Sequence, residues 1–135
     1  TPIIGVATGT SLAVTGLLSS SGTAGIGYAT GAGGTIAQGV SKATTVVLNK
    51  TSGAITMDAT SLAAGAIVSF TLTNSTIAAT DVLILNHISG GTVGSYTLNA
   101  QAGAGAATIN VRNNTAGALA EAVVIQFAVI KAVSS

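Results

Sequence analysis

Two stretches of this chain alternate strictly between apolar and polar side chains, and this pattern restricts them to β-strands. In residues 66–73, Val68, Phe70 and Leu72 alternate with serine and threonine. In residues 107–113, Ile109 and Val111 alternate with threonine, asparagine and arginine. Successive side chains of a strand point to opposite faces of its sheet, so a period of two places one face on a core and the other in water. Both stretches are therefore predicted to be half-buried strands.

Two further pairs of stretches have the spacing of hairpins. Residues 44–48 and 54–57 flank a turn-like segment. Residues 81–88 and 95–100 lie on either side of a Gly-Gly turn signal. Strands joined by such short turns usually pair with each other, so each pair is predicted to form a hairpin.

Two stretches are apolar on both faces. Residues 81–88 and 122–133 therefore predict strands that are covered on both sides, with 81–88 central in its sheet. The alanines and leucine of residues 115–121 predict a helical turn that Gly117 keeps short. Short strands with regular turn signals and no long amphipathic helix predict an all-β fold, an antiparallel β-sandwich or barrel-like body.

Five glycines lie in the segment G-I-G-Y-A-T-G-A-G-G at 25–34. Their spacing, G-x-G-x-x-x-G, differs from the dinucleotide-binding G-x-G-x-x-G, and no helical pattern follows it, so a phosphate-binding loop is not expected. We interpret the segment as a joint, which divides the chain into an extended arm (1–24), a glycine-rich joint (25–40) and a β-rich body (41–135). Tyr28, its one large side chain, is predicted to cover an apolar edge or a subunit seam.

The arm is rich in glycine, serine and threonine and has too few bulky side chains to build a core of its own. Its aliphatic side chains would be costly to leave in water, which favours packing on another subunit or a neighbouring protein. A disordered tail is the alternative. The predicted assembly contacts are Ile3, Ile4, Leu12, Val14, Leu17, Leu18 and Tyr28.

The scarcity of charge also favours assembly. The chain is 48% hydrophobic and 5% charged, whereas about a quarter of the residues of ordinary globular proteins are charged. A net charge of +1 from four scattered basic residues does not predict nucleic-acid binding. The N-terminal residues lack the basic region of a signal peptide, and the most apolar segment, 122–133, is shorter than the roughly 20 residues of a membrane-spanning helix. With no cysteine, neither disulfides nor thiolate metal sites are expected.

Catalysis is not predicted, and neither a metal nor a cofactor is expected. His87 is the single histidine; a Ser-His-Asp arrangement with Asp81 is imaginable, but no G-x-S-x-G elbow is present. A hydrogen-bonded histidine at a strand end or subunit contact is the expected role. For Arg112 and Lys131 two alternatives stay open, an ion pair with Glu121 or Asp81 across an interface, or an ordinary solvated position.

A set of motifs occurs together between residues 25 and 133. They are G-I-G-Y-A-T-G-A-G-G-T at 25–35 with Gln38, S-K at 41–42, V-x-L-N-K at 46–50, G-x-I-T-M at 53–57, L-A-A-G-x-x-V-S-F-T-L-T-N-S at 62–75, D-V-L-x-L-N-H at 81–87 and F-A-V-I-K at 127–131. In this combination the chain resembles small virion surface proteins of tailed bacteriophages, including capsid decoration proteins, head fibres and fibre-terminal modules. The preceding G-T-S-L-A-V-T-G at 9–16 resembles segments that lead into phage fibre heads.

The resemblance implies a homotrimeric β-rich body on a phage particle, with no catalysis and no cofactor. The chain lacks a long repetitive shaft, so we expect a capsid decoration (cement) or head-fibre protein on the capsid exterior, whose arm binds the major capsid protein or another virion protein. The alternative is the distal trimeric domain of a tail fibre that contacts a host surface receptor.

Overall fold

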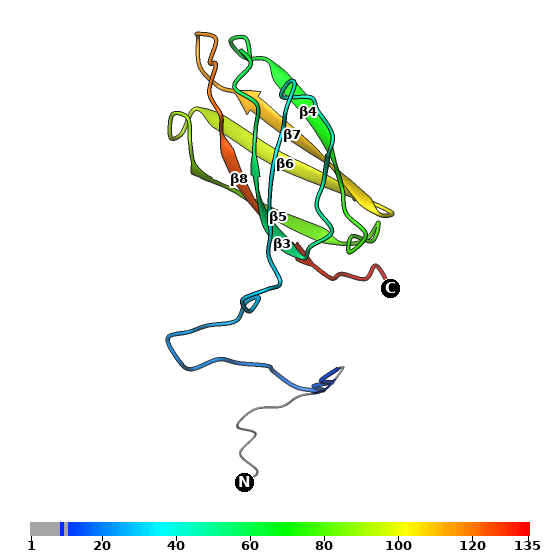
Figure 1. Ribbon diagram of the computed structural model, residues 1–135. Helices are drawn as coiled ribbons and strands as arrows, with labels where there is room; N and C mark the ends of the chain where they lie inside the picture. Colours follow the sequence, from blue (N-terminus) through cyan, green and yellow to red (C-terminus); the bar gives the residue numbers. More distant parts are fainter. Residues whose placement is uncertain (1–8, 10) are drawn as a thin grey trace.

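The computed structural model describes residue 9 and residues 11–135, and its regular structure consists of β-strands (Figure 1). Within that described part there is no helix, and hence none long and apolar enough to cross a membrane. The strands are β1 (Thr35–Ala37), β2 (Val46–Val47), β3 (Ser52–Thr56), β4 (Ile67–Thr73), β5 (Val82–Ser89), β6 (Tyr96–Gly103), β7 (Ala106–Asn113) and β8 (Val124–Ile130).

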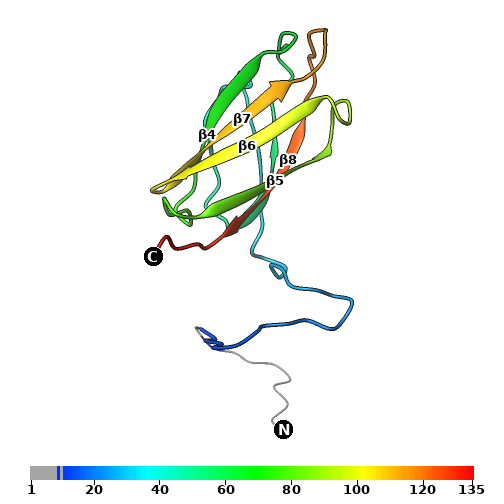
Figure 2. The same cartoon turned by 180° about the vertical axis from the view of Figure 1, so that it is seen from behind.

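The strands form two four-stranded sheets that pack face to face. Sheet I has the order β1-β3-β8-β5, and sheet II has the order β2-β4-β7-β6. Figure 2 shows β4, β7 and β6 side by side in sheet II. Most neighbouring strands are antiparallel, whereas the edge strands β1 and β2 run parallel to β3 and β4. The prediction of an all-β sandwich is confirmed, with these two parallel pairs as additions.

The core lies between the two sheets and is mainly aliphatic. In sheet II, Phe70 of β4 lies opposite Ile109 of β7 and Leu72 lies opposite Ala107, and all four side chains are buried on the face that the period-two pattern predicts. In sheet I, the inner strand β8 and the residue before it contribute four side chains with no exposed surface. These are Val123, which directly precedes the strand, Ile125, Phe127 and Val129. The core residues are thus supplied mainly by the inner strands of both sheets.

Both hairpins predicted from short turns are wrong, because the chain crosses from one sheet to the other at those turns. β2 lies in sheet II and β3 in sheet I, while β5 lies in sheet I and β6 in sheet II. A turn signal marks a change of direction and does not determine whether the next strand pairs with the previous one. The hairpin that does form joins β6 to β7, through a turn in which Gly105 has a positive φ of 73°.

Two other local predictions are also wrong. β5 is an edge strand, and its outer side chains are exposed instead of covered. Residues 115–121 form no helical turn. Leu119 instead exchanges backbone hydrogen bonds with Leu62, and the Gly117 carbonyl accepts a hydrogen bond from the side chain of Asn113.

Buried asparagines hold the loops at both ends of the sandwich. The amide nitrogen of Asn113 donates to the carbonyls of Leu62, Ala63 and Gly117, and its oxygen accepts from the main-chain nitrogen and hydroxyl of Thr115. Asn74 binds Thr76 in the same way and donates to the carbonyl of Lys50. Such Asx turns satisfy backbone groups where the ladder hydrogen bonds end.

Candidate assembly surface

The outer faces of the two sheets differ in chemistry. On sheet I, Val82 lies opposite Ile130 and Ile84 lies opposite Ala128, so four apolar side chains of β5 and β8 form one outward-facing patch. Val82 is 52% exposed, Ile84 49% and Ile130 48%. We call these four residues the apolar face. The middle of the same sheet is polar, with Asn86 opposite Gln126.

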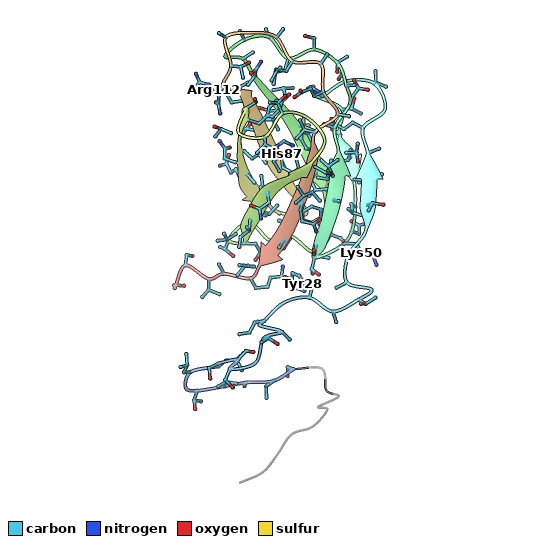
Figure 3. All side chains as sticks on the ribbon, turned by 90° about the vertical axis from the view of Figure 1, so that its left-hand side faces the viewer. Tyr28, Lys50, His87 and Arg112 are labelled. Atoms are coloured by element: carbon cyan, nitrogen blue, oxygen red, sulfur yellow. The ribbon has the colours of Figure 1, made fainter. Side chains whose placement is uncertain are left out.

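The glycine-rich joint folds against the apolar face. The hydroxyl of Tyr28 donates a hydrogen bond to the main-chain carbonyl of Val129 in β8. Ile26, Gly27 and Tyr28 then form one wall of an open hollow of about 480 Å³, whose other wall comes from Ile84, Ala128, Ile130 and Lys131. Figure 3 shows Tyr28 at the end of the body from which the arm departs. The hollow is thus lined mainly by apolar atoms from both the joint and sheet I.

Two glycines of the joint have backbones that other residues rarely adopt. Gly25 has a φ of 69° and Gly31 a φ of 96°, both in the left-handed region. Gly27 differs, because a side chain added there would meet nothing within 4 Å. These positive angles redirect the chain between the arm and β1.

The described residues of the arm lie away from the body (Figure 1). None of the hydrogen bonds found in the described part of the chain involves residues 11–24. The arm residues with large exposed apolar side chains are Leu12 (68%), Val14 (46%), Leu17 (89%) and Leu18 (60%). Ile3 and Ile4, the other predicted arm contacts, lie outside the described residues. The structure thus brings Tyr28 onto the sheet and leaves the other described contact candidates without partners within the described chain.

An ion pair lies beside the apolar face. Lys131 Nζ is 2.6 Å from Asp81 Oδ2, and Ala78 donates its main-chain N–H to the same carboxylate oxygen. These bonds, first from Ala78 and then from Lys131, hold the pKa of Asp81 below its usual range. Of the two alternatives for Lys131, the ion pair with Asp81 is formed, but within one chain instead of across an interface, and it joins the segment that follows β8 to the loop that precedes β5.

The opposite end of the sandwich holds a second polar cluster. The carboxylate of Glu121 accepts hydrogen bonds from the hydroxyl of Thr92 at 2.6 Å, the main-chain N–H of Thr92 at 2.9 Å and the hydroxyl of Tyr96 at 2.7 Å. The Thr92 and Tyr96 hydroxyls, followed by the N–H, lower the pKa of Glu121. Burial, and then the Glu121 carboxylate, raises the pKa of Tyr96.

Lys42 is buried and donates to the main-chain carbonyls of Asp58 and Glu121. Its desolvation lowers its pKa.

His87 belongs to this second cluster. Its Nε2 is hydrogen-bonded with the carbonyl of Gly90, and its ring meets that of Tyr96 edge-on at a centroid distance of 5.9 Å. Asp81 precedes β5 and His87 lies near its far end, so six residues of extended chain, about 20 Å, separate them. The imagined Ser-His-Asp arrangement with Asp81 is therefore not formed. No group of three potential metal-ligating side chains is found in residue 9 or residues 11–135.

Comparisons with known proteins give no relative for this chain. Neither a family model, nor a curated protein, nor a solved structure matches it. The candidate surface therefore has to be interpreted from its own chemistry.

The residues that sequence reasoning missed are those of the apolar face itself and Ile26. The signal was present, because residues 81–88 are apolar on both sides. On its own, that pattern predicts a central strand covered on both sides. On an edge strand, the same pattern leaves an exposed apolar outer face, which is typical of interaction surfaces.

Proposed function

We propose that this chain is a non-enzymatic structural protein of a tailed-phage virion, a capsid decoration or head-fibre protein that forms a homotrimer. In this proposal the arm binds the shell and the β-sandwich projects from it. The observation that carries the assembly role is the apolar face of sheet I. The corresponding face of sheet II is mainly polar, because β4, β6 and β7 present mostly hydroxyl and amide side chains there, with Ile67, Ala106 and Arg112 among them, and Val47 lies on the edge strand β2.

The apolar face is too small to stabilise an assembly without contacts from the arm. Full burial of an aliphatic side chain contributes about 1.5–3 kcal/mol, so covering the exposed half of Val82, Ile84 and Ile130 contributes about 1 kcal/mol each. Association costs on the order of 4–15 kcal/mol in translational and rotational freedom. The exposed leucines of the arm offer more apolar area per residue than the face does. Stable association therefore requires both surfaces.

The absence of charge in the arm supports the same role. The first charged side chain of the sequence is Lys42, so residues 1–41 contain no side chain that is charged at neutral pH. An uncharged segment with exposed aliphatic side chains can be buried in an interface without the desolvation penalty of charges. The described part of the arm and the C-terminus lie at the same end of the body (Figure 1), which leaves the other end free to project.

The assignment to a phage particle rests on the motifs between residues 25 and 133 that resemble virion surface proteins. The test is binding to capsids purified from the phage that encodes the chain. We expect a variant lacking residues 1–24 to lose occupancy, because the arm supplies the apolar contacts. Undiminished occupancy would contradict the proposal. A finer comparison is Leu17→Ser with Leu18→Ser, predicted to bind weakly, against Ser19→Ala with Ser20→Ala, predicted to bind normally.

The second candidate function is the distal domain of a tail fibre that contacts a host receptor. It is favoured by the polar face of sheet II, which is free at the projecting end. A low-resolution image of the intact particle separates the two functions. Density on the capsid faces supports the decoration protein, and density only at the fibre tips, with phage adsorption blocked by the isolated chain, supports the receptor-binding domain.

A further inference from the structure

Arg112 is set apart from the other charged residues by its lack of a partner. The chain has four basic and three acidic side chains. The other six take part in hydrogen bonds or ion pairs within the chain: Lys42, Lys50, Asp58, Asp81, Glu121 and Lys131. Among the described residues, no group bonds the guanidinium of Arg112. A chain that commits nearly all of its charges to structure thus keeps one strong donor group exposed.

Arg112 lies in an ordered row of the polar face. Ile67 of β4 and Thr97 of β6 are its register partners on either side. In the adjacent row, Asn110 lies between Ser69 and Asn99. Together Ile67, Thr97, Asn99, Asn110 and Arg112 line an open hollow of about 310 Å³. This volume is at the lower end of the range of small-molecule sites, about 300–1,000 Å³, and suits a single sugar-sized ring.

The hydrogen bonds around the hollow leave two side-chain donors without an acceptor among the described residues. Ser69 donates to the Asn110 amide oxygen at 2.5 Å, and the Asn110 amide nitrogen donates to the Asn99 oxygen at 2.6 Å. The Asn99 nitrogen then has no acceptor among the described residues. The Thr97 hydroxyl accepts from Asn114 at 2.8 Å, so its own hydrogen is available. The hollow thus offers a guanidinium, an amide and a hydroxyl as donors, beside the exposed side chain of Ile67.

This combination selects a class of ligand. A guanidinium presents a planar fork of donors that matches a carboxylate bidentately. Amide and hydroxyl groups hydrogen-bond sugar hydroxyls, and an aliphatic side chain packs on the C–H face of a sugar ring. None of the three acidic residues lines the hollow, so the guanidinium meets no competing carboxylate there. We propose that the Arg112 hollow binds an acidic saccharide, with the carboxylate of a uronic acid on Arg112 and its hydroxyls on Thr97 and Asn99.

The site lies far from the proposed assembly surface. Figure 3 shows Arg112 at the end of the body opposite Tyr28 and Lys50. Since the arm leaves from the Tyr28 end, the hollow faces outward in a molecule held by its arm. The ligand site is carried by sheet II alone and stands whether or not the chain forms a trimer.

Titration of the full, ¹⁵N-labelled chain with D-glucuronate tests the proposal, with glucose, acetate and inorganic phosphate as separate probes. We expect glucuronate to shift the backbone amides of β6, β7 and the start of β4 and to bind about tenfold more tightly than glucose or acetate. No shift in these strands, or acetate binding as well as glucuronate, would overturn the saccharide site. Tighter binding of phosphate than of glucuronate would overturn the carboxylate specificity and with it the proposal.

Substitutions of Arg112 distinguish bidentate hydrogen bonding by its guanidinium from attraction by its positive charge alone. Arg112→Gln is expected to weaken glucuronate binding at least about tenfold, and Arg112→Lys to lose most of the same affinity because a lysine lacks the planar fork. Lys50→Gln, which removes an exposed cation at the opposite end, is the matched control and should bind normally. Equal losses in Arg112→Gln and Lys50→Gln, or normal binding by Arg112→Lys, would show that general charge attraction is sufficient and that the site is wrongly assigned.

Discussion

The hydroxyl of Tyr28 donates a hydrogen bond to the main-chain carbonyl of Val129, across 101 residues of sequence. Val129 lies at the core near the end of β8, so this bond fastens the glycine-rich joint to a strand inside sheet I. The same contact places Ile26 and Tyr28 beside the apolar face. The base of the arm and the candidate assembly surface are thus one continuous unit.

Tyr28→Phe removes this bond while keeping the ring. A typical intramolecular hydrogen bond contributes about 0.5–1.5 kcal/mol, so we expect a loss of that size in the free energy of unfolding only if the joint unfolds together with the body. The more direct readout is amide hydrogen exchange, which should become faster in residues 25–34 and stay unchanged in β4 and β7. Unchanged exchange in the joint would show that Tyr28 does not hold the arm base.

Ile84→Asn tests the apolar face. Because Ile84 is on the outer side of an edge strand, we expect the free energy of unfolding of a single chain to change by no more than about 0.5 kcal/mol. Self-association, measured by sedimentation equilibrium, should weaken about tenfold or more, since an apolar contact is lost and an amide is desolvated. Val47→Asn on the edge strand of sheet II, where Val47 is 57% exposed, is the control. Equal effects of the two variants on association would argue against a specific role for the apolar face.

The sequence predicts the individual strands better than it predicts their pairing. The alternation of Phe70, Leu72, Ile109 and Val111 determines which side chains face the core, because that depends on each strand alone. Pairing depends on whether a turn keeps the chain in one sheet, and the Gly-Gly turn after β5 carries no such information. The apolar pattern of β5 is visible in the sequence but does not say what lies against its outer face. A strand covered by its own chain and a strand covered by another molecule both need apolar side chains on both faces. The Arg112 hollow depends on register across three strands, which sequence patterns do not give.

Asn113→Ala is predicted to destabilise the fold strongly. The Asn113 side chain has no exposed surface and makes five hydrogen bonds, so its truncation removes all five and leaves a cavity at a buried position. We expect the free energy of unfolding in urea to fall by about 2–4 kcal/mol. Asn114 is the next residue, but it is exposed, and its side chain donates to the Thr97 hydroxyl. Asn114→Ala should therefore lower the free energy of unfolding by less than about 1 kcal/mol. Similar losses for both variants would contradict the organising role of Asn113.

Acid is predicted to destabilise the fold through Glu121 and Asp81. Their pKa values are lowered in the folded chain, Glu121 by Thr92 and Tyr96 and Asp81 by Ala78 and Lys131. A lowered folded pKa contributes stability that is present above the unfolded value, about 4, and is lost as the pH falls through the folded value. The melting temperature should therefore be nearly constant from about pH 7 to 5 and fall below about pH 4.

Glu121→Gln provides the control for this pH dependence. The variant should melt at a lower temperature than the unmodified chain at neutral pH, because the amide replaces the charged acceptor of three hydrogen bonds. The difference between the two should shrink in acid, where Glu121 itself becomes protonated. A difference that is independent of pH would exclude the carboxylate charge as its cause.

The mass of the full chain in solution, measured by sedimentation velocity over a range of concentrations, tests the proposed assembly most directly. A trimer joined through the apolar face and the arm predicts a particle of three times the 12.8 kDa of one chain, which dissociates in the Ile84→Asn variant. A single species of 12.8 kDa at every concentration would contradict the homotrimer.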